Sequence, residues 1–422
     1  MTTAAPQWTD TAIWYAVYPL GLTGAPMDGS HLRPDAGVEH RMGRLAAWLD
    51  HLLGLGCNGL LLGPIFSSVR HGYDTLDYFA IDPRLGDGDD FDRLIEACRS
   101  RGIRVLLDGV FNHVAATYPA LVDALASPQA ESSDWFHIDY SADPPVRLNF
   151  EGSDDLVLLN HDSPAVVKLV GDVMRHWLAR GIDGWRLDAA YAVNPEFWAR
   201  VLPAVRAEYP DAFFVGEVIH ADFDKIAASG LTSITAYELW KAVWSSISDR
   251  NFFELDWTLT RLNELLDLGR PVTFVGNHDV TRITTRIGPS GALLALVIMM
   301  TLGGTPAIYY GDEGGAEGTK FERAGGDDEI RPEMPADPAD WVPPVPWLLD
   351  AHRALISIRR QNTWLVDARL EKVELTNERY VYRVVAGTDW LEVELDLTGG
   401  YLAMVSDRTG QLYRYQDAAA TE

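Results

Sequence analysis

The stretch GIDGWRLDAA, residues 181–190, is the part of the chain that best indicates the fold. Its apolar members, among them Trp185 and Leu187, are typical of a buried strand. Asp188 stands where that strand should end, and Arg186 stands two residues earlier. On an extended strand, residues two apart point to the same side. A buried strand that delivers an arginine and an aspartate to one side predicts a polar site at its carboxyl end.

Seven further aliphatic or β-branched runs resemble this one, and amphipathic helical segments separate several of them. The eight predicted strands are Ile13–Tyr18, Gly59–Leu62, Ile103–Leu107, Gly184–Leu187, Phe213–Gly216, Ser233–Tyr237, Val272–Val275 and Ala307–Tyr310. Eight strands that alternate with helices favour a (β/α)8 barrel over a doubly wound sheet. The expected fold class is therefore α/β, with a TIM barrel.

Two segments do not fit the barrel pattern. The spacing between the third and fourth strands is too long for one helix, and residues 114–162 are rich in Ser, Asp and Pro. We interpret them as a short insertion after strand 3, named the B insertion. Alternating runs such as RYVYRVVAG and DWLEVELDL predict a small antiparallel β domain over residues 363–422. The barrel would then comprise residues 1–113 and 163–362.

Composition narrows the range of partners. Acidic residues outnumber basic ones by 61 to 35, for a formal net charge of -26. This charge argues against binding nucleic acid or an anionic membrane, and it also suits simple solubility. Cys57 and Cys98 lie in apolar contexts, so we expect core thiols. No secretory signal is visible and LLALVIMMTLGG is too short to span a membrane, so a cytoplasmic location is expected.

Polar motifs follow five of the predicted strands. They are HGYDTLDY (71–78), DGVFNH (108–113), RLD (186–188), GEVIH (216–220) and GNHD (276–279). In a barrel, the loops after the strands meet at one mouth, where active sites lie. A single aspartate could cap the next helix, and a single histidine could be structural. Five polar motifs on one rim are difficult to explain by capping, and they predict a functional site.

Paired carboxylates at a barrel mouth suit the cleavage of a glycosidic bond, with one carboxyl ionised and the other protonated. We expect Asp188 to be the ionised member, because Arg186 can hold it charged and oriented through a charge-assisted hydrogen bond. Glu217 would then be the acid. A catalytic metal is the competing interpretation, but no HxH or HExxH spacing supports it.

In order and spacing, DGVFNH, GWRLDAA, GEVIH and FVGNHD resemble the four conserved regions of the α-amylase family, glycoside hydrolase family 13. HGYDTLDY resembles the segment before the first region, GTPAIYYGDE resembles the eighth strand, and LVLLNHDSP resembles the end of the B domain. The resemblance runs from about Trp14 to Ile358. It implies a relative of the small intracellular α-glucosidases and amylases.

The resemblance implies three catalytic residues. Asp188 resembles the nucleophile that forms a covalent glycosyl-enzyme, and Glu217 resembles the general acid/base. Asp279 resembles the second aspartate, which binds sugar hydroxyls and favours the distorted transition state. A double displacement with retention of the α configuration would follow, with the two carboxyls of Asp188 and Glu217 about 5–5.5 Å apart.

The resemblance also implies substrate-binding residues. Tyr73 resembles the aromatic platform under the sugar, and Arg186 resembles the arginine that positions the nucleophile. His113 and His278 resemble the histidines that hydrogen-bond the sugar. No cofactor is required by this chemistry. Calcium would be held only if Asn112, which matches the family's calcium-ligand asparagine, had acidic partners, and the sequence presents no convincing set.

Two features bear on substrate specificity. Tyr191-Ala192 stands where many amylases have Lys-His gripping the leaving-side sugar, so contacts on that side must differ. The segment DDEIRPEMP, residues 327–335, resembles the Arg-x-Pro-Met segment of exo-acting α-glucosidases. By that resemblance Arg331 would pair with Asp74 and close the pocket around a terminal glucose. The alternative is that Arg331 is a surface loop residue.

Three classes of function fit these observations. The first is a retaining hydrolase of malto-oligosaccharides or related small α-glucosides, whose partner is a small oligosaccharide and neither nucleic acid nor membrane. The second is a transglycosylase or isomerase on the same scaffold, such as a glucanotransferase or trehalose-forming enzyme, because water and sugar compete for one covalent intermediate. The third is a non-catalytic carbohydrate-binding subunit, which the presence of Asp188, Glu217 and Asp279 disfavours.

Overall fold

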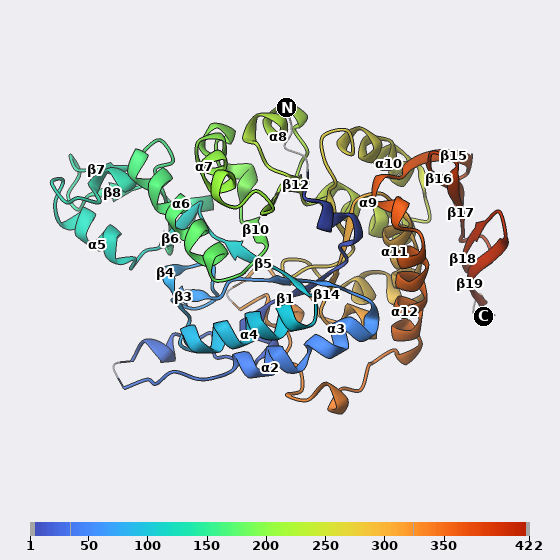
Figure 1. Cartoon of the computed structure of the whole chain (residues 1–422), viewed down its shortest axis with the longest axis horizontal. Coiled ribbons are helices and arrows are strands. Elements are labelled where there is room, and N and C mark those ends of the chain that lie inside the picture. Colours follow the sequence, from blue (N-terminus) through green and yellow to red (C-terminus); the bar gives the residue numbers. More distant parts are fainter. Residues whose placement is uncertain (1–4, 34, 324, 419–422) are drawn as a thin grey trace.

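A parallel sheet of eight strands forms the centre of the molecule (Figure 1). The computed structural model describes residues 5–33, 35–323 and 325–418. The central strands are β1 (Trp14–Val17), β2 (Gly59–Leu62), β5 (Arg104–Gly109), β10 (Gly184–Leu187), β11 (Phe213–Gly216), β12 (Ser233–Ile234), β13 (Val272–Phe274) and β14 (Thr305–Tyr309). Their order is β12-β11-β10-β5-β2-β1-β14-β13.

The sheet closes on itself between β12 and β13. Thr235 forms a parallel bridge with Val272, and the N–H of Ala236 donates to the carbonyl of Val272 at 2.9 Å. All eight predicted strands are present, and the α/β barrel is confirmed. The sixth strand ends earlier than predicted, at Ile234, because Tyr237 already begins helix α9 (Tyr237–Ser248).

Helices surround the barrel. Besides α9 they are α2 (Met42–Ala47), α3 (Leu49–Leu55), α4 (Gly88–Ser100), α6 (Pro164–Ala179), α7 (Pro195–Glu208), α8 (Phe223–Ser229), α10 (Phe253–Leu265), α11 (Ile283–Thr301) and α12 (Pro346–Gln361), with a single turn, α1 (Pro19–Leu22), after β1. Their apolar stripes explain their placement. In α4 the buried residues Phe91, Leu94, Ile95 and Cys98 recur at helical spacing and face the core.

Helix α11 corrects one expectation from the sequence. Its 19 residues are long and apolar enough to cross a membrane by length and composition alone. The apolar run LLALVIMMTLGG, residues 293–304, covers only the second part of this element and continues past its end into two glycines. A left-handed Gly288 and Pro289 kink the element near its start. In the structure 72% of its most apolar 18-residue segment is buried, as in a helix that packs in a protein core.

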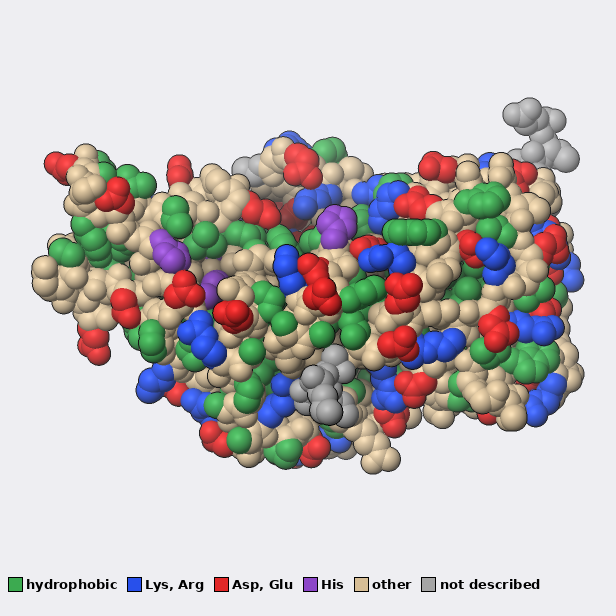
Figure 2. Space-filling view, turned by 90° about the horizontal axis from the view of Figure 1, so that it is seen from above, with side chains coloured by type: hydrophobic (Ala, Val, Ile, Leu, Met, Phe, Trp, Pro, Cys, Tyr) green, Lys and Arg blue, Asp and Glu red, His purple; other side chains and the backbone are tan. Residues whose placement is uncertain are grey.

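Two smaller units lie at opposite ends of the long axis (Figure 1). The B insertion contains β6 (His113–Ala115), α5 (Pro119–Ala126), β7 (Ile138–Asp139), β8 (Val146–Arg147) and β9 (Leu156–Leu158). It packs near a hairpin of β3 (Phe66–Ser68) and β4 (Thr75–Ile81), with β4 touching β6. Acidic and basic side chains are interspersed over the face that Figure 2 shows.

The chain ends in a five-stranded antiparallel meander. Its strands are β15 (Arg369–Leu375), β16 (Arg379–Ala386), β17 (Asp389–Asp396), β18 (Gly400–Asp407) and β19 (Gly410–Ala418). The predicted antiparallel β domain is confirmed. The sequence pattern missed β15, because its RLEKVEL run is mostly exposed and lacks a clear apolar alternation.

Arg359 joins α12 to the end of α11. Its buried guanidinium donates to the carbonyls of Met300, Leu302 and Gly304 at 3.0, 2.7 and 2.5 Å. Burial, and then the charge of Arg360, lower the pKa of Arg359 to about 9. The three carbonyl oxygens, at the negative end of helix α11, are therefore the main groups that stabilise the buried charge of Arg359.

Replacing Arg359 by methionine should destabilise the fold. The substitution keeps most of the side-chain volume but leaves three buried carbonyls without a donor, so the free energy of unfolding should fall by about 2–5 kcal/mol. Urea denaturation would measure the change. Arg353→Met is the matched control, because Arg353 lies on the same helix and pairs only with exposed Asp350. Equal losses in the two variants would contradict the assigned role of Arg359.

Candidate active site

Arg186 is the centre of the site. It is buried on β10, and its Nη1 donates to both carboxylate oxygens of Asp108 at 2.8 Å and to Asp188 at 2.9 Å. Its Nη2 lies 2.9 Å from Oε1 of Glu217. The three acids come from or directly follow the neighbouring strands β5, β10 and β11. The expected hydrogen bond between Arg186 and Asp188 is present, and the structure adds two more acids to the same guanidinium.

The charges in this cluster do not balance. Burial raises the pKa of Asp188 well above its ordinary value; Arg186 opposes the rise, and Glu217 and Asp108 add to it. Burial also raises the pKa of Asp108 to about 6, although Arg186 lowers it. The expectation that Arg186 keeps Asp188 charged is therefore incomplete. Arg186 orients Asp188, while Asp108 and Asp188 retain protons more strongly than free carboxyls because both are buried.

Glu217 is held from three sides. Besides Arg186, the N–H of Ala189 donates to its Oε2 at 2.8 Å, and the hydroxyl of Tyr237 donates to its Oε1 at 3.0 Å. Ala189 has a φ of 46°, a left-handed conformation that costs free energy in a non-glycine residue. This turn directly after Asp188 aims the N–H at Glu217. Asn277 Nδ2 in turn donates to the Tyr237 oxygen at 2.8 Å.

The sequence did not single out Tyr237. The residue was assigned to the end of a strand, and its side chain was given no role. The available signal was its position, because Tyr237 follows β12 on the same rim as the polar motifs. Asp108 was part of a motif on that rim, yet its contact with Arg186 depends on the register of β5 against β10, in which Asp108 stands opposite Arg186.

Asp279 is paired with Arg331. The Nη2 of Arg331 lies 3.1 Å from Asp279 Oδ1 and 2.8 Å from Asp327 Oδ2, and its Nε donates to the carbonyl of His278 at 2.9 Å. Burial alone would raise the pKa of Asp279. His278, Arg331 and Arg186 outweigh burial and lower it. Since His278 is itself neutral over most of the pH range, we attribute the lowering mainly to the arginines.

The predicted ion pair between Asp74 and Arg331 is wrong. The short helical turn before Arg331 places Asp327 one turn away, and that acid takes the arginine. Asp74 is buried and accepts the N–H of His71 at 3.2 Å, and its nearest arginine contact is Arg70 at 3.9 Å. The alternative, a surface side chain at Arg331, is also wrong, because this side chain is only 5% exposed.

Tyr73 and His278 lie side by side in the site. Their rings are stacked with centroids 5.4 Å apart, and the Tyr73 hydroxyl contacts His278 Nε2 and donates to Asp108 at 3.1 Å. A second ring, Tyr18, stacks with His278 at 6.1 Å. Burial lowers the pKa of His278 to about 3. The structure therefore brings these predicted sugar-binding residues next to the acid cluster.

His113 lies behind them. Its Nε2 contacts the carbonyl of Tyr73 at 3.1 Å, its Nδ1 contacts the amide of Asn112 at 3.1 Å, and Phe150 stacks on its ring at 4.7 Å. Both ring nitrogens thus already have protein partners, and neither is free for a sugar hydroxyl in this geometry. Burial lowers the pKa of His113 to about 4.

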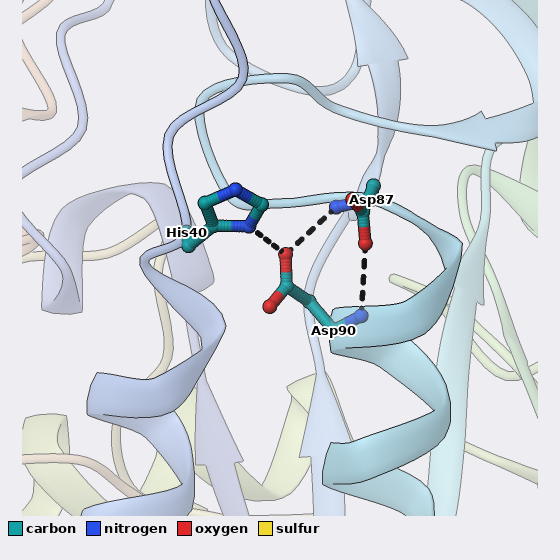
Figure 3. Close-up of side chains that lie close together, drawn as sticks. All are labelled: His40, Asp87 and Asp90. Carbon is teal, nitrogen blue, oxygen red and sulfur yellow. Dashed lines mark hydrogen bonds and ion pairs between the residues drawn. The ribbon is translucent and has the colours of Figure 1, made fainter.

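In the described part of the chain, one group of three side chains of the types that bind metal ions lies close together, and this group lies outside the site. His40, Asp87 and Asp90 lie together at the start of α4 (Figure 3). Asp87 accepts the N–H of Asp90 at 3.0 Å and Asp90 accepts that of Asp87 at 3.1 Å, which is a helix capping box. The side-chain amide nitrogen of Asn112 lies 3.1 Å from Nδ1 of His113.

A cleft of about 820 Å³ opens beside the acids. Its lining includes Tyr73, Asp279 and Arg331 from the site, and Glu151 and Asp155 from the B insertion. Further arginine and aspartate side chains line it as well, namely Arg70, Arg323, Asp327 and Asp328. The surroundings are polar and suit a ligand rich in hydroxyl groups.

These geometric findings agree with a comparison against protein families. A family model described as "Alpha amylase, catalytic domain" matches residues 42–368. The chain belongs to the α-amylase family. Among the relatives, the intracellular maltogenic amylase of Bacillus subtilis is 33% identical over 341 residues, which is 75% of this chain and 58% of the relative. The cyclomaltodextrinase of Geobacillus thermopakistaniensis (strain MAS1) is 30% identical over 79% of this chain and 60% of the relative.

The chain therefore spans about three-fifths of the length of these α-amylase relatives. A solved structure matches it over nearly its full length. The cyclic α-maltosyl-(1→6)-maltose hydrolase from Arthrobacter globiformis is 26% identical, with a TM-score of 0.82, over 97% of this chain and 99% of that chain. A solved cyclomaltodextrinase is 27% identical, with a TM-score of 0.78, over 96% of this chain and 73% of that chain.

His278 and His113 should remain neutral at pH 5.5. Burial disfavours the charged imidazolium, so protonation requires a pH near their lowered pKa values, about 3 and about 4. Imidazole ¹⁵N shifts recorded between pH 7.5 and 5.5 would test this, with assignments from single His→Gln variants. His40 is the internal control, because its hydrogen bond to Asp90 raises its pKa and it should be protonated in that range. Protonation of His278 above pH 5.5 would contradict the buried, neutral assignment.

Proposed function

We propose that this α-amylase-family protein is a retaining hydrolase of α-glucosidic bonds in malto-oligosaccharides and related small α-glucosides. The observation that carries the proposal is the pair Asp188 and Glu217, whose carboxylates contact adjacent nitrogens of the Arg186 guanidinium. Two carboxyls held this close suit a covalent double displacement rather than direct attack by water between them. Asp279 stands across the same site, on the wall of the cleft.

In the proposed reaction, Asp188 attacks the anomeric carbon while Glu217 gives its proton to the departing glycosidic oxygen. Water then donates a proton to Glu217 and attacks the same carbon, which releases Asp188. This step needs a proton on Glu217 while Asp188 is ionised. Burial raises the pKa of Asp188, and the hydrogen bond from Arg186 opposes that rise and favours the ionised form.

We assign direct contact with the sugar to residues on the cleft wall: Tyr73, Asp279 and Arg331. His278 would contribute as a neutral hydrogen-bonding ring. Asp74 and His113 are buried behind Tyr73 and bond to the backbone of its loop, at the N–H of His71 and the carbonyl of Tyr73. Their contribution to substrate binding would come from holding that loop in place.

Similarity to relatives supports small substrates. The relative that matches over the full length is named for a cyclic tetrasaccharide, and others are named cyclomaltodextrinases. We infer for this chain the same class, short or cyclic α-glucans. We also propose a cytoplasmic location, as the name of the Bacillus subtilis relative suggests.

The proposed division into barrel, B insertion and β domain is supported by two element starts: β6 begins at His113, and the terminal sheet begins at Arg369.

Asp188→Asn should abolish turnover while the fold is retained. The amide cannot form the glycosyl-enzyme, so kcat for maltotriose should fall by about 10⁴-fold or more. Asp183→Asn is the matched control, because Asp183 lies just before the same strand at its opposite end and binds Arg104. Near-native turnover in Asp188→Asn would refute the assigned nucleophile.

The wild-type protein should release products with the α configuration. Proton NMR of the first products from maltoheptaose distinguishes α from β anomers before mutarotation, and chromatography of the same samples gives the chain lengths. Initial α products are expected from two displacements, each of which inverts the carbon. Initial β products would mean direct attack by water and would overturn the mechanism. Longer products than the substrate would favour the transglycosylase alternative.

A further inference from the structure

One segment of the B insertion has an unusual backbone. Glu151 has a φ of 48° and Gly152 a φ of 75°, so two successive residues are left-handed. For the glutamate this conformation is unfavourable, because its Cβ crowds the following carbonyl oxygen. The surrounding structure must supply contacts that hold it. We name residues Phe150–Asp155 the clamp segment.

Three contacts attach the clamp segment to different parts of the barrel mouth. Phe150 stacks on the ring of His113, with centroids 4.7 Å apart. Asp155 forms an ion pair with Arg70, from the loop between β3 and β4. Glu151 accepts a hydrogen bond from the hydroxyl of Tyr191 at 2.9 Å. The anchors lie in β6, in the loop between β3 and β4, and in the loop after β10, so the clamp segment is fixed at the barrel mouth while Glu151 and Asp155 stay exposed to solvent.

The Tyr191 contact differs from the other two because it reaches the loop that carries the reacting acids. Tyr191 follows Asp188 by three residues, and its N–H donates to the carbonyl of Glu217 at 3.0 Å. Glu151 is part of the lining of the 820 Å³ cleft. The Tyr191–Glu151 hydrogen bond thus joins the B insertion, which lines the cleft at Glu151, to the loop that directly follows Asp188.

We propose that the hydrogen bond between Tyr191 and Glu151 is a specificity determinant that restricts this protein to short α-glucans. The inference rests on the proposed hydrolase function. A bond that ties the cleft-lining Glu151 to the loop after Asp188 narrows the way past the reacting acids, so it obstructs a long α-glucan more than a short one. The obstruction is local and reversible, because Tyr191 is partly exposed and the contact is a single hydrogen bond.

Tyr191→Phe tests the proposal, since it removes one hydroxyl and leaves the ring. The quantity to measure is the ratio of kcat/KM for soluble amylose to kcat/KM for maltotriose. In the wild type this ratio should lie below one. In Tyr191→Phe it should rise about tenfold, the factor expected for loss of one hydrogen bond to a carboxylate. Thermal unfolding of each variant would confirm that it is folded.

Two further variants make the result specific. Glu151→Gln should raise the ratio in the same direction, and the double variant should exceed neither single variant by more than about twofold if both act through one bond. Tyr140→Phe is the control, because its hydroxyl donates to Ala124 within the same insertion, and its ratio should match the wild type.

An unchanged ratio in folded Tyr191→Phe would overturn the specificity role, as would an equal rise in Tyr140→Phe. If the wild-type protein cleaves neither maltotriose nor amylose while remaining folded, the proposed hydrolase function itself fails. The two failures are therefore distinguishable, because the first requires measurable turnover of maltotriose by the wild type.

Discussion

A single buried guanidinium organises the mouth of this barrel. Arg186 contacts Asp108, Asp188 and Glu217, from three adjacent strands, within hydrogen-bonding distance. Leaving three buried acids together without a cation would be very unfavourable, and a buried arginine without acids would be equally so. The geometry of each acid is therefore tied to that of the others. Burial raises the pKa of both Asp108 and Asp188, and the single arginine opposes this rise at both acids.

A second buried pair stabilises the opposite wall. Arg282 is fully buried, pairs with Asp312 at 2.8 Å and donates to the carbonyl of Ile330 at 2.8 Å. That carbonyl precedes Arg331, whose guanidinium fixes Asp279. The position of Asp279 thus depends on two arginines in series, one that holds the loop and one that holds the acid. Such indirect support explains how a loop far along the chain contributes to the site.

Prediction from the sequence succeeded for features that leave a clear pattern along the chain. Buried parallel strands leave continuous apolar runs, so all eight were visible, and acids such as Asp188 and Asp279 were conspicuous at their ends. Which side chains contact one another in the site was harder to predict from the sequence. The pairing of Arg331 depends on one short helical turn that brings Asp327 within reach, and the hydroxyl of Tyr237 has a role only because β12 ends early. Both depend on local backbone geometry, which the apolar pattern of a sequence does not specify.

The barrel has a seam where β12 meets β13 through the single bridge between Thr235 and Val272. The hydrogen bond from Asn277 to Tyr237, which continues to Glu217, crosses this same seam. In the described barrel, the joint with the least backbone pairing is therefore also joined by the side chains that hold Glu217. An opening of the barrel at this joint would displace Glu217 as well.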